Sequence, residues 1–354
     1  MFQLHIGNQN FSKITDFGLD ISAFSEMEKA ALVFCKGWLS GQKQFLQQTS
    51  GSTGVPKRIE LTREQMQASA EATGAFFNSN PTTRLLCCLN PEYIAGKMML
   101  VRAMVWDCPI WLVEPAGNPL ERLDFVPDFV AMVPLQVEKT LESTDSLSTL
   151  KRVGSLIIGG AQLSESLKSQ LTKHNIQAWQ TYGMTETVSH IALAKIEKDE
   201  LRYETLPGVL IGQDKRGALW VKSAMSGAKK VQTNDLVELL SDDAFQWLGR
   251  VDFTVNSGGI KLHPELLEQK SEAAIHANFP SSRFFFFGEK DEKLGERLVL
   301  VLEGTAKKEQ TQLLLKQLQA VLSPYEVPKK IYFSDAFIET PNGKINRKLS
   351  FESL

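Results

Sequence analysis

The chain is poor in cysteine, has no long apolar run and carries no excess of charge, and each absence excludes a class of protein. Only four cysteines occur among 354 residues, and none forms a Cys-x-x-Cys pair. Neither a cysteine-ligated metal site nor a disulfide framework is therefore expected. Because the cysteines lie mostly inside apolar stretches, we expect buried free thiols at these four positions: Cys35, Cys87, Cys88 and Cys108.

No stretch approaches the roughly 20 apolar residues of a membrane span. The first ten residues also lack the charged start and apolar run of a secretory signal. With 39 basic and 41 acidic residues, the net charge of −2 argues against binding to nucleic acid, which depends on clustered positive charge. We therefore expect a cytoplasmic protein that neither spans membranes nor binds nucleic acid.

What the chain does contain is an alternation of strand and helix patterns. Thr62 and Gln65 form a capping box that opens one helix, and Ser164 can cap another. Between such helices lie short apolar runs, typical of parallel strands buried on both faces, at residues 85–89, 110–113, 129–133 and 153–158. This alternation predicts an α/β fold with a mostly parallel sheet.

The pattern changes twice further along the chain. Residues 207–247 contain glycine-punctuated strands without helical spacers, which predict a β-rich subdomain. Beyond residue 250, a proline-initiated helix at 264 and apolar strands predict a smaller α+β unit. We therefore divide the chain into a large domain, residues 1–250, and a small C-terminal domain, residues 251–354.

A glycine-rich segment near the N-terminus has the composition of a phosphate-binding loop. Glycines let backbone N–H groups approach an anion, while hydroxyls and a lysine add further donors. It is not a Walker loop, because Pro56 separates the second glycine from the lysine. The alternative is an ordinary surface turn. The candidate residues are Thr49, Ser50, Gly51, Ser52, Thr53, Gly54 and Lys57.

Two further segments follow predicted strands, where open α/β sheets bind ligands. In the first, Thr185 can donate to a phosphate and Glu186 can bind Mg²⁺, with Tyr182 and Gly183 just before them. A capped turn is the alternative. In the second, the missing side chains would let a flat base lie against the backbone; its residues are Gly159, Gly160 and Ala161.

Three charged residues complete the candidate site. Asp235 and Arg250 suit the hydroxyls of a ribose, because one accepts and the other donates hydrogen bonds. Lys344 lies on a Pro-Asn-Gly turn between apolar residues, from which it could reach a developing anion. The alternative for all three is solvated surface charge.

Taken in order, these motifs resemble those of the adenylate-forming acyl-CoA synthetase family. The resemblance spans residues 49–348 and includes 249–252 and 257–259. It implies two steps: a carboxylic acid is adenylated by ATP with release of pyrophosphate, and CoA then displaces AMP to form a thioester. ATP, Mg²⁺ and CoA are thus the expected small-molecule partners, together with the acid.

The resemblance also assigns roles. The loop 49–57 would hold the β and γ phosphates, Thr185 the α phosphate and Glu186 the Mg²⁺. Lys344 would stabilise the charge that develops during adenylation. The ribose would lie against Asp235 and Arg250, and the adenine and acyl group against the glycine pair and alanine at 159–161.

In this family the small domain rotates between the two steps. Asp252 matches the hinge, while Gly258 and Gly259 match a loop that would leave space for pantetheine. Departures also occur: Phe253 replaces a frequent acidic residue, and Asn234 replaces a commoner glycine. Only 48 residues precede the loop, so we expect most of one N-terminal subdomain to be missing.

The acid is suggested by a narrower resemblance. The run 185–192 is similar to the corresponding segment of o-succinylbenzoate–CoA ligases of menaquinone biosynthesis. Arg102 could clamp the second carboxylate of such an acid, with Lys97 as a weaker candidate and Ser189 and His190 as hydrogen-bonding partners. The alternative is that Arg102 is a helix-surface residue.

Other functions stay open at this stage. The acid could be another aryl acid, phenylacetic acid or a fatty acid. The chain could instead load a carrier protein, or it could be a truncated regulator that only binds an adenylate. Intact Lys344 and Glu186 argue against the regulator. An oligomer is compatible with the sequence, which does not fix the oligomeric state.

Overall fold

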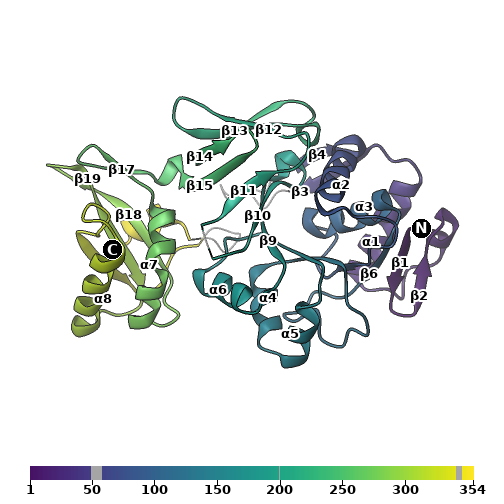
Figure 1. Ribbon diagram of the computed structural model, residues 1–354, viewed down its shortest axis with the longest axis horizontal. Coiled ribbons are helices and arrows are strands. Elements are labelled where there is room, and N and C mark those ends of the chain that lie inside the picture. The colour runs from purple at the N-terminus through teal and green to yellow at the C-terminus, as the bar shows by residue number, and fades with distance from the viewer. Residues whose placement is uncertain (49–57, 199, 340–344) are drawn as a thin grey trace.

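The computed structural model describes residues 1–354 except for 49–57, 199 and 340–344. In this part of the chain, a sheet of 13 strands forms the larger body and a five-stranded sheet the smaller one (Figure 1). Six neighbouring strands of the large sheet pair in parallel: β9 (Ala178–Gly183), β8 (Ser155–Ile158), β7 (Phe129–Met132), β5 (Leu85–Cys87), β6 (Pro109–Leu112) and β1 (Gln3–Ile6). The α/β fold predicted from the alternating patterns is confirmed.

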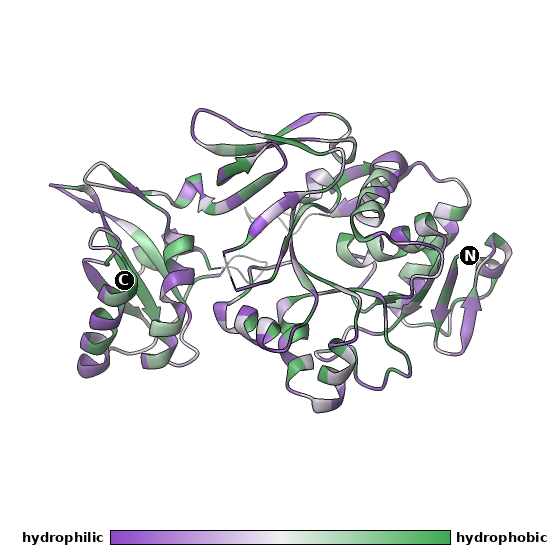
Figure 2. Cartoon of the chain, viewed as in Figure 1, coloured by the Kyte–Doolittle hydropathy of each residue, from purple (hydrophilic) through white to green (hydrophobic). Residues whose placement is uncertain are grey.

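Both faces of this parallel part are buried, which explains its continuous apolar runs. Successive residues of β5, Leu85 and Leu86, belong to two different hydrophobic clusters, as do Phe129 and Val130 of β7. Hydrophobic residues accordingly follow the strands, while hydrophilic ones lie on the outer helix faces (Figure 2). The covering helices are α1 (Glu26–Leu39), α2 (Arg63–Phe77), α3 (Ile94–Trp106), α4 (Pro134–Leu141), α5 (Thr144–Leu150) and α6 (Glu165–Lys173).

Local signals in the sequence account for several boundaries. Thr62 accepts a hydrogen bond from the backbone of Gln65 at the start of α2, and Ser164 caps α6 in the same way. All four cysteines are free and buried, as expected. Within the described residues, no helix combines the length and apolar character that crossing a membrane requires.

The antiparallel strands continue the large sheet. Strand β10 (His190–Lys195) pairs antiparallel with β9, so the β-rich segment extends the sheet from its edge. The remaining strands of this part are β11 (Arg202–Thr205), β15 (Ala244–Arg250), β14 (Lys230–Ser241), β13 (Ala218–Lys222) and β12 (Leu210–Gln213). Because β10 runs antiparallel to β9, the carboxyl end of β9 lies beside the start of β10, where the parallel and antiparallel parts of the sheet meet.

The N-terminal residues contain elements for which we predicted none. Strand β1 extends the parallel sheet beside β6, and β2 (Gln9–Phe11) pairs with β1. Strands β3 (Gln44–Gln48) and β4 (Arg58–Thr62) form a separate antiparallel pair on either side of the glycine-rich segment. The capping box of Ser25 and Glu28 at the start of α1 was a readable signal.

The C-terminal part has its own sheet and its own hydrophobic clusters, which contain no residue before Val255. Helix α7 (Pro264–Asn278) begins with the predicted proline. The other elements are β16 (Val255–Ser257), β17 (Ile260–Leu262), β18 (Phe284–Asp291), β19 (Gly295–Glu303), α8 (Lys308–Val321), β20 (Lys330–Ser334) and α9 (Arg347–Glu352). Separate clusters agree with a domain boundary near residue 250, which stays a prediction.

Candidate active site

The candidate site lies where β9 ends and β10 begins. The two strands approach closely here, and only glycine fits at position 183: a Cβ on Gly183 would lie 2.3 Å from the carbonyl oxygen of Ser189. The connection contains a short 3-10 helix, η2 (Thr185–Thr187), so Thr185 and Glu186 stand directly beyond β9. Glu186 is exposed and has no ion-pair partner among the described residues. Its carboxylate is therefore available to a ligand.

A polar cluster on β9, β14 and β15 lies beside this connection. The hydroxyl of Tyr182 donates to Oδ2 of Asp235 at 2.7 Å, and Nη1 of Arg250 is 3.6 Å from Oδ1. The Asp235 side chain is only 16% exposed, so it is not simply solvated surface charge. Burial and, secondly, the Asp235 carboxylate raise the pKa of the Tyr182 hydroxyl well above its usual range. Tyr182 thus stays a neutral donor that orients Asp235.

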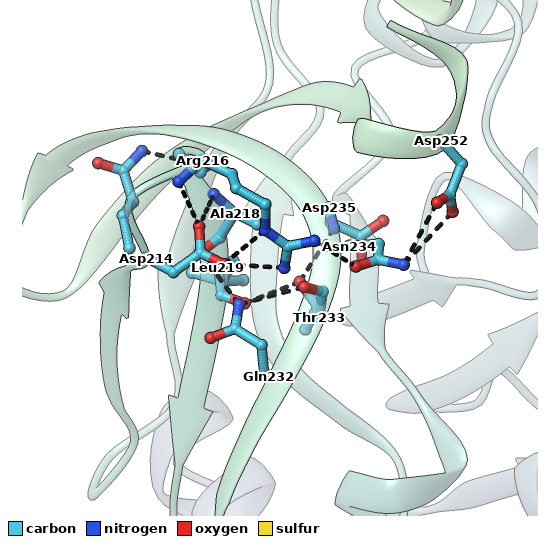
Figure 3. Close-up of polar contacts among 11 residues, drawn as sticks. Asp214, Arg216, Ala218, Leu219, Gln232, Thr233, Asn234, Asp235 and Asp252 are labelled. Atoms are coloured by element: carbon cyan, nitrogen blue, oxygen red, sulfur yellow. Dashed lines mark hydrogen bonds and ion pairs between the residues drawn. The ribbon is translucent and has the colours of Figure 1, made fainter.

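The same arginine reaches the predicted hinge. Nη2 of Arg250 donates to Asp252 at 2.8 Å, within the 3-10 turn η4 (Val251–Phe253). Figure 3 shows Asn234 between Asp252 and Arg216; its Nδ2 donates to both Asp252 oxygens, at 3.4 and 3.5 Å. Arg250 therefore links the candidate ribose contact Asp235 to the candidate hinge Asp252.

The glycines after β8 also have a structural role in the fold. A Cβ on Gly159 would lie 2.4 Å from the hydroxyl oxygen of Thr181, so this glycine allows β8 and β9 to approach closely. Gly160 has a φ of +86°, which favours glycine. Gly160 and Ala161 are exposed beyond β8, near the end of β9. Close packing against the Thr181 side chain is one reason for a glycine at position 159, and its place beside the adenine stays a prediction.

These residues fit a nucleotide with a magnesium ion. A partly buried carboxylate, an arginine and threonine hydroxyls offer acceptors and donors of the kinds that ribose and phosphate require. The described residues hold no cluster of three or more His, Cys, Asp or Glu that could cage a metal. One exposed carboxylate, Glu186, suits Mg²⁺, which takes few protein ligands and keeps waters and phosphate oxygens.

In the predicted binding site of the carboxylic acid, Arg102 of α3 is 1% exposed. The alternative that Arg102 lies on the surface of its helix is therefore wrong. Its Nη2 lies 3.3 Å from Oγ of Ser189 and 3.5 Å from Nδ1 of His190, which brings these three predicted residues together. No described acidic residue pairs with it, and its Nε has no hydrogen-bond partner. Burial lowers the pKa of Arg102 to about 10. A buried cation is thus left without a counter-ion.

His190 is held as a neutral acceptor towards this arginine. The hydroxyl of Thr73 donates to the carbonyl of Ser69, so it accepts from Nε2 of His190 at 3.2 Å. Nδ1 then carries the lone pair that faces Arg102. Burial and, secondly, Arg102 hold the pKa of His190 well below its usual range. The cation of this group is therefore Arg102 alone.

Lys97 does not join this group. Five residues before Arg102 on the same helix, it points in a different direction, since each residue advances the helix by about 100°. Its Nζ donates to Oε1 of Gln47 at 2.8 Å and lies 5.7 Å from the ring centre of Phe34. Burial lowers its pKa. The structure separates Lys97 from Ser189 and His190.

The predicted pantetheine loop lies in the small part of the molecule, not beside β9 and β10. Gly258 and Gly259 form the turn between β16 and β17, at one edge of the five-stranded sheet of the small part. Helix α7 lies between that sheet and the larger body (Figure 1). The loop 49–57 and Lys344 fall outside the described residues.

Two residues that shape the surroundings of Arg102 carry no signal in the sequence. Thr73 was hidden because one threonine inside an amphipathic helix gives no distinct signal. Val188 is fully buried with a φ of +66°, a conformation that costs a branched residue about 1–3 kcal/mol. This turn leads directly into Ser189 and His190. No sequence pattern marks a β-branched residue in that conformation.

Comparison with known proteins agrees with this geometry. Residues 42–213 match the family described as AMP-binding enzyme. A relative from Mycobacterium tuberculosis, named probable 2-succinylbenzoate–CoA ligase, is 28% identical over 274 residues, covering 72% of this chain and 69% of the relative. A 2-succinylbenzoate–CoA ligase from Salmonella typhimurium is 24% identical over 78% of this chain and 62% of its own length.

Solved structures show the same fold. One is o-succinylbenzoate coenzyme A synthetase from Bacillus subtilis in complex with ATP and magnesium, with a TM-score of 0.69 at 19% identity over 86% of this chain and 69% of that one. Another, an acyl-CoA synthetase (AMP-forming)/AMP-acid ligase II-like protein from Dyadobacter fermentans, is 40% identical with a TM-score of 0.65, covering 97% of this chain and 98% of that one. With a relative this similar over nearly its whole length, the chain belongs to the AMP-binding enzymes and is an acyl-CoA synthetase of the AMP-forming type.

Proposed function

We propose that this enzyme adenylates 2-succinylbenzoate with ATP and transfers the acyl group to CoA, a step of menaquinone biosynthesis. The observation that carries the choice of acid is Arg102, a buried cation with no acidic partner among the described residues. A buried charge without a counter-ion is costly, so such a group is typical of a site for a charged ligand. An acid with two carboxylates supplies one to react and one to pair with Arg102.

On the nucleotide side, the described residues suit binding and orientation. Asp235, held by Tyr182 at 2.7 Å, would accept from a ribose hydroxyl, and Arg250 would donate to the ribose. Thr185 would donate to the α phosphate. Glu186 would bind Mg²⁺, which when present neutralises phosphate charge. The loop 49–57 would hold the β and γ phosphates.

In the first step, a carboxylate oxygen of the acid attacks the α phosphorus of ATP. The bond from that phosphorus to the β-phosphate oxygen breaks, and pyrophosphate leaves with the bonding electrons. Arg102, with Ser189, would fix the distant carboxylate and so align the reacting one. Lys344 would stabilise the negative charge that develops between the two reactants.

In the second step, the CoA sulfur attacks the acyl carbonyl carbon, the thiol proton leaves, and AMP departs with the carboxyl oxygen. Gly258 and Gly259, in the turn between β16 and β17 of the small part, would line the thiol's approach after the small domain rotates about Asp252. Residues 1–250 and 251–354 would be the two bodies of that rotation, and the cytoplasm its location.

A panel of acids tests the assignment. Pyrophosphate release is measured with ATP, Mg²⁺ and each of 2-succinylbenzoate, benzoate, phenylacetate and a fatty acid. Each reaction is run with and without CoA. We expect the largest kcat/KM with 2-succinylbenzoate and thioester formation only with CoA. Preference for a monocarboxylic acid would refute the proposed substrate. An acyl adenylate that CoA does not discharge would favour a carrier-protein loader instead.

A further inference from the structure

The small C-terminal part contains a largely buried ion pair outside the site described above. Nη1 and Nη2 of Arg347 donate to the two carboxylate oxygens of Glu268 at 2.7 and 2.8 Å, and the side chains are 14% and 17% exposed. The backbone N–H of Phe286 also donates to Glu268, at 2.8 Å. Two parallel hydrogen bonds fix the orientation of a guanidinium as well as its position. Arg347 is therefore locked to helix α7.

The same face of α7 holds the segment that enters the small part. Glu265 lies one turn before Glu268, so both carboxylates project from one side of the helix. Its Oε2 accepts from the backbone N–H of Arg250 at 3.3 Å. The guanidinium of Arg347 also lies 4.5 Å from the ring centre of Phe253, next to Asp252. The hinge segment and the start of α9 are thus anchored side by side.

Both ends of the segment that carries Lys344 are held as well. Glu339 and Ile345 form an isolated antiparallel bridge, which fixes the distance between its ends. The N–H of Asn346 donates to the carbonyl of Ile338 at 2.8 Å, and Oγ of Ser350 accepts from the N–H of Ile338 at 2.9 Å. Lys344 itself lies outside the described residues, three positions before Arg347. These contacts join the described residues on both sides of it, 338–339 and 345–350, into one stem.

We propose that Arg347 and Glu268 are positioning residues for adenylation: their bidentate pair fixes the stem of the Lys344 segment relative to the hinge. This inference rests on the role assigned to Lys344 in the proposed function. A misplacement of about 1 Å can lower a rate about 100-fold, so the orientation of the stem matters to the chemistry. Only adenylation uses Lys344, and the pair therefore acts on one half-reaction.

Losing Arg347 alone would leave Glu268 buried and unpaired, which could unfold the small part. The test therefore uses the double variant E268M/R347M, which replaces the pair with apolar side chains of similar length. Arg297→Met is the matched control, because Arg297 pairs with Glu289 at 2.7 Å across β18 and β19 and has no polar contact with the described residues of the stem. Arg347→Lys keeps the positive charge but cannot make both hydrogen bonds to Glu268 in the same geometry.

Two half-reactions are measured for each variant: pyrophosphate release from ATP and 2-succinylbenzoate, and thioester formation from synthetic acyl adenylate and CoA. We expect the double variant to lose about 100-fold in adenylation and little in thioester formation. Arg347→Lys should fall between it and the wild type, and Arg297→Met should match the wild type. Equal losses in both half-reactions, or none, would overturn the positioning role.

Amide hydrogen exchange gives a readout that needs no substrate. The double variant should expose the amides of Asn346, Leu349 and Ser350 to faster exchange, while Arg297→Met should not. Unchanged exchange in this segment would also overturn the inference. Wild-type protein that released no pyrophosphate with any acid would count against the proposed function alone, because the exchange result would still decide whether the pair holds the stem.

Discussion

Arg102 in the large body and Arg347 in the small one are both shielded from water, but within the described part of the chain only Arg347 has an anionic partner. Arg347 is held by both oxygens of Glu268, whereas the described polar partners of Arg102 are a hydroxyl, an imidazole nitrogen and a thioether sulfur. Protein stability explains the first arrangement and not the second. An arginine that the fold itself leaves unpaired is better explained by a ligand, and a paired one by the geometry it maintains.

The largest expected effect concerns stability. Arg347→Met leaves Glu268 without its counter-ion, so the free energy of unfolding should fall by about 3–5 kcal/mol. Arg102 has no counter-ion among the residues that the structure describes, so Arg102→Met should not destabilise the ligand-free protein. Denaturant unfolding followed by fluorescence measures both. A similar loss in the two variants would show that Arg102 has a structural partner after all.

The next effect is on catalysis. Arg102→Met should lower kcat/KM for 2-succinylbenzoate roughly 100-fold. This corresponds to a loss of about 3 kcal/mol of binding free energy, as expected when one partner of a buried ion pair is removed. Activity towards benzoate should not fall. Arg84→Met is a suitable control, because Arg84 already pairs with Asp128 at 3.0 Å. Unchanged turnover of the diacid would exclude the clamp.

A smaller effect separates the two regions by pH. The pKa of His190 is lowered, so its stabilising contribution is present above about pH 6.5, its unfolded value, and is lost as pH falls. His190→Gln should remove up to about 1.4 kcal/mol per pH unit from the dependence of the unfolding free energy on pH.

The ion pair of the small body should show the opposite dependence. Burial raises the pKa of Glu268 to about 7, so the stability that Glu268 contributes is lost as pH rises towards 7. E268M/R347M should therefore change the slope in the opposite direction; unfolding free energies at pH 5 to 8 check both signs.

The smallest effect is expected at Ser189. Ser189→Ala removes one acceptor of Arg102, and a single hydrogen bond contributes about 1 kcal/mol, so kcat/KM for the diacid should fall about fivefold. Kinetics with 2-succinylbenzoate measure this change. A loss as large as that of Arg102→Met would mean that the serine, not the arginine, dominates recognition.

The sequence predicted the parallel sheet well because its strands are buried on both faces and give continuous apolar runs. Capping residues such as Thr62 and Ser164 located the helices that cover it. The first 48 residues were not assigned, because β1 is four residues long and depends on pairing with β6, far along the chain. Non-local pairing leaves little trace in a short segment.

The candidate site was predicted as a set of separate motifs, and its spatial grouping was only partly foreseen. Arg102, Ser189 and His190 meet as expected, but Lys97 faces elsewhere because five helical residues turn its side chain away. Gly159 serves close strand packing, which composition cannot distinguish from a ligand contact. The strain at Val188 depends on its surroundings and has no sequence signature.

The buried cysteines have a practical consequence for studying a reaction that consumes a thiol. Burial raises the pKa of Cys87 and of Cys108 to about 12 and that of Cys35 and Cys88 further, and all four are fully shielded from solvent. Thiolates are the reactive species, so the folded enzyme should be nearly silent towards thiol-specific dyes. The consumption of free CoA can therefore be followed with such a dye while the folded enzyme is present. The same dye would react with the protein once it unfolds.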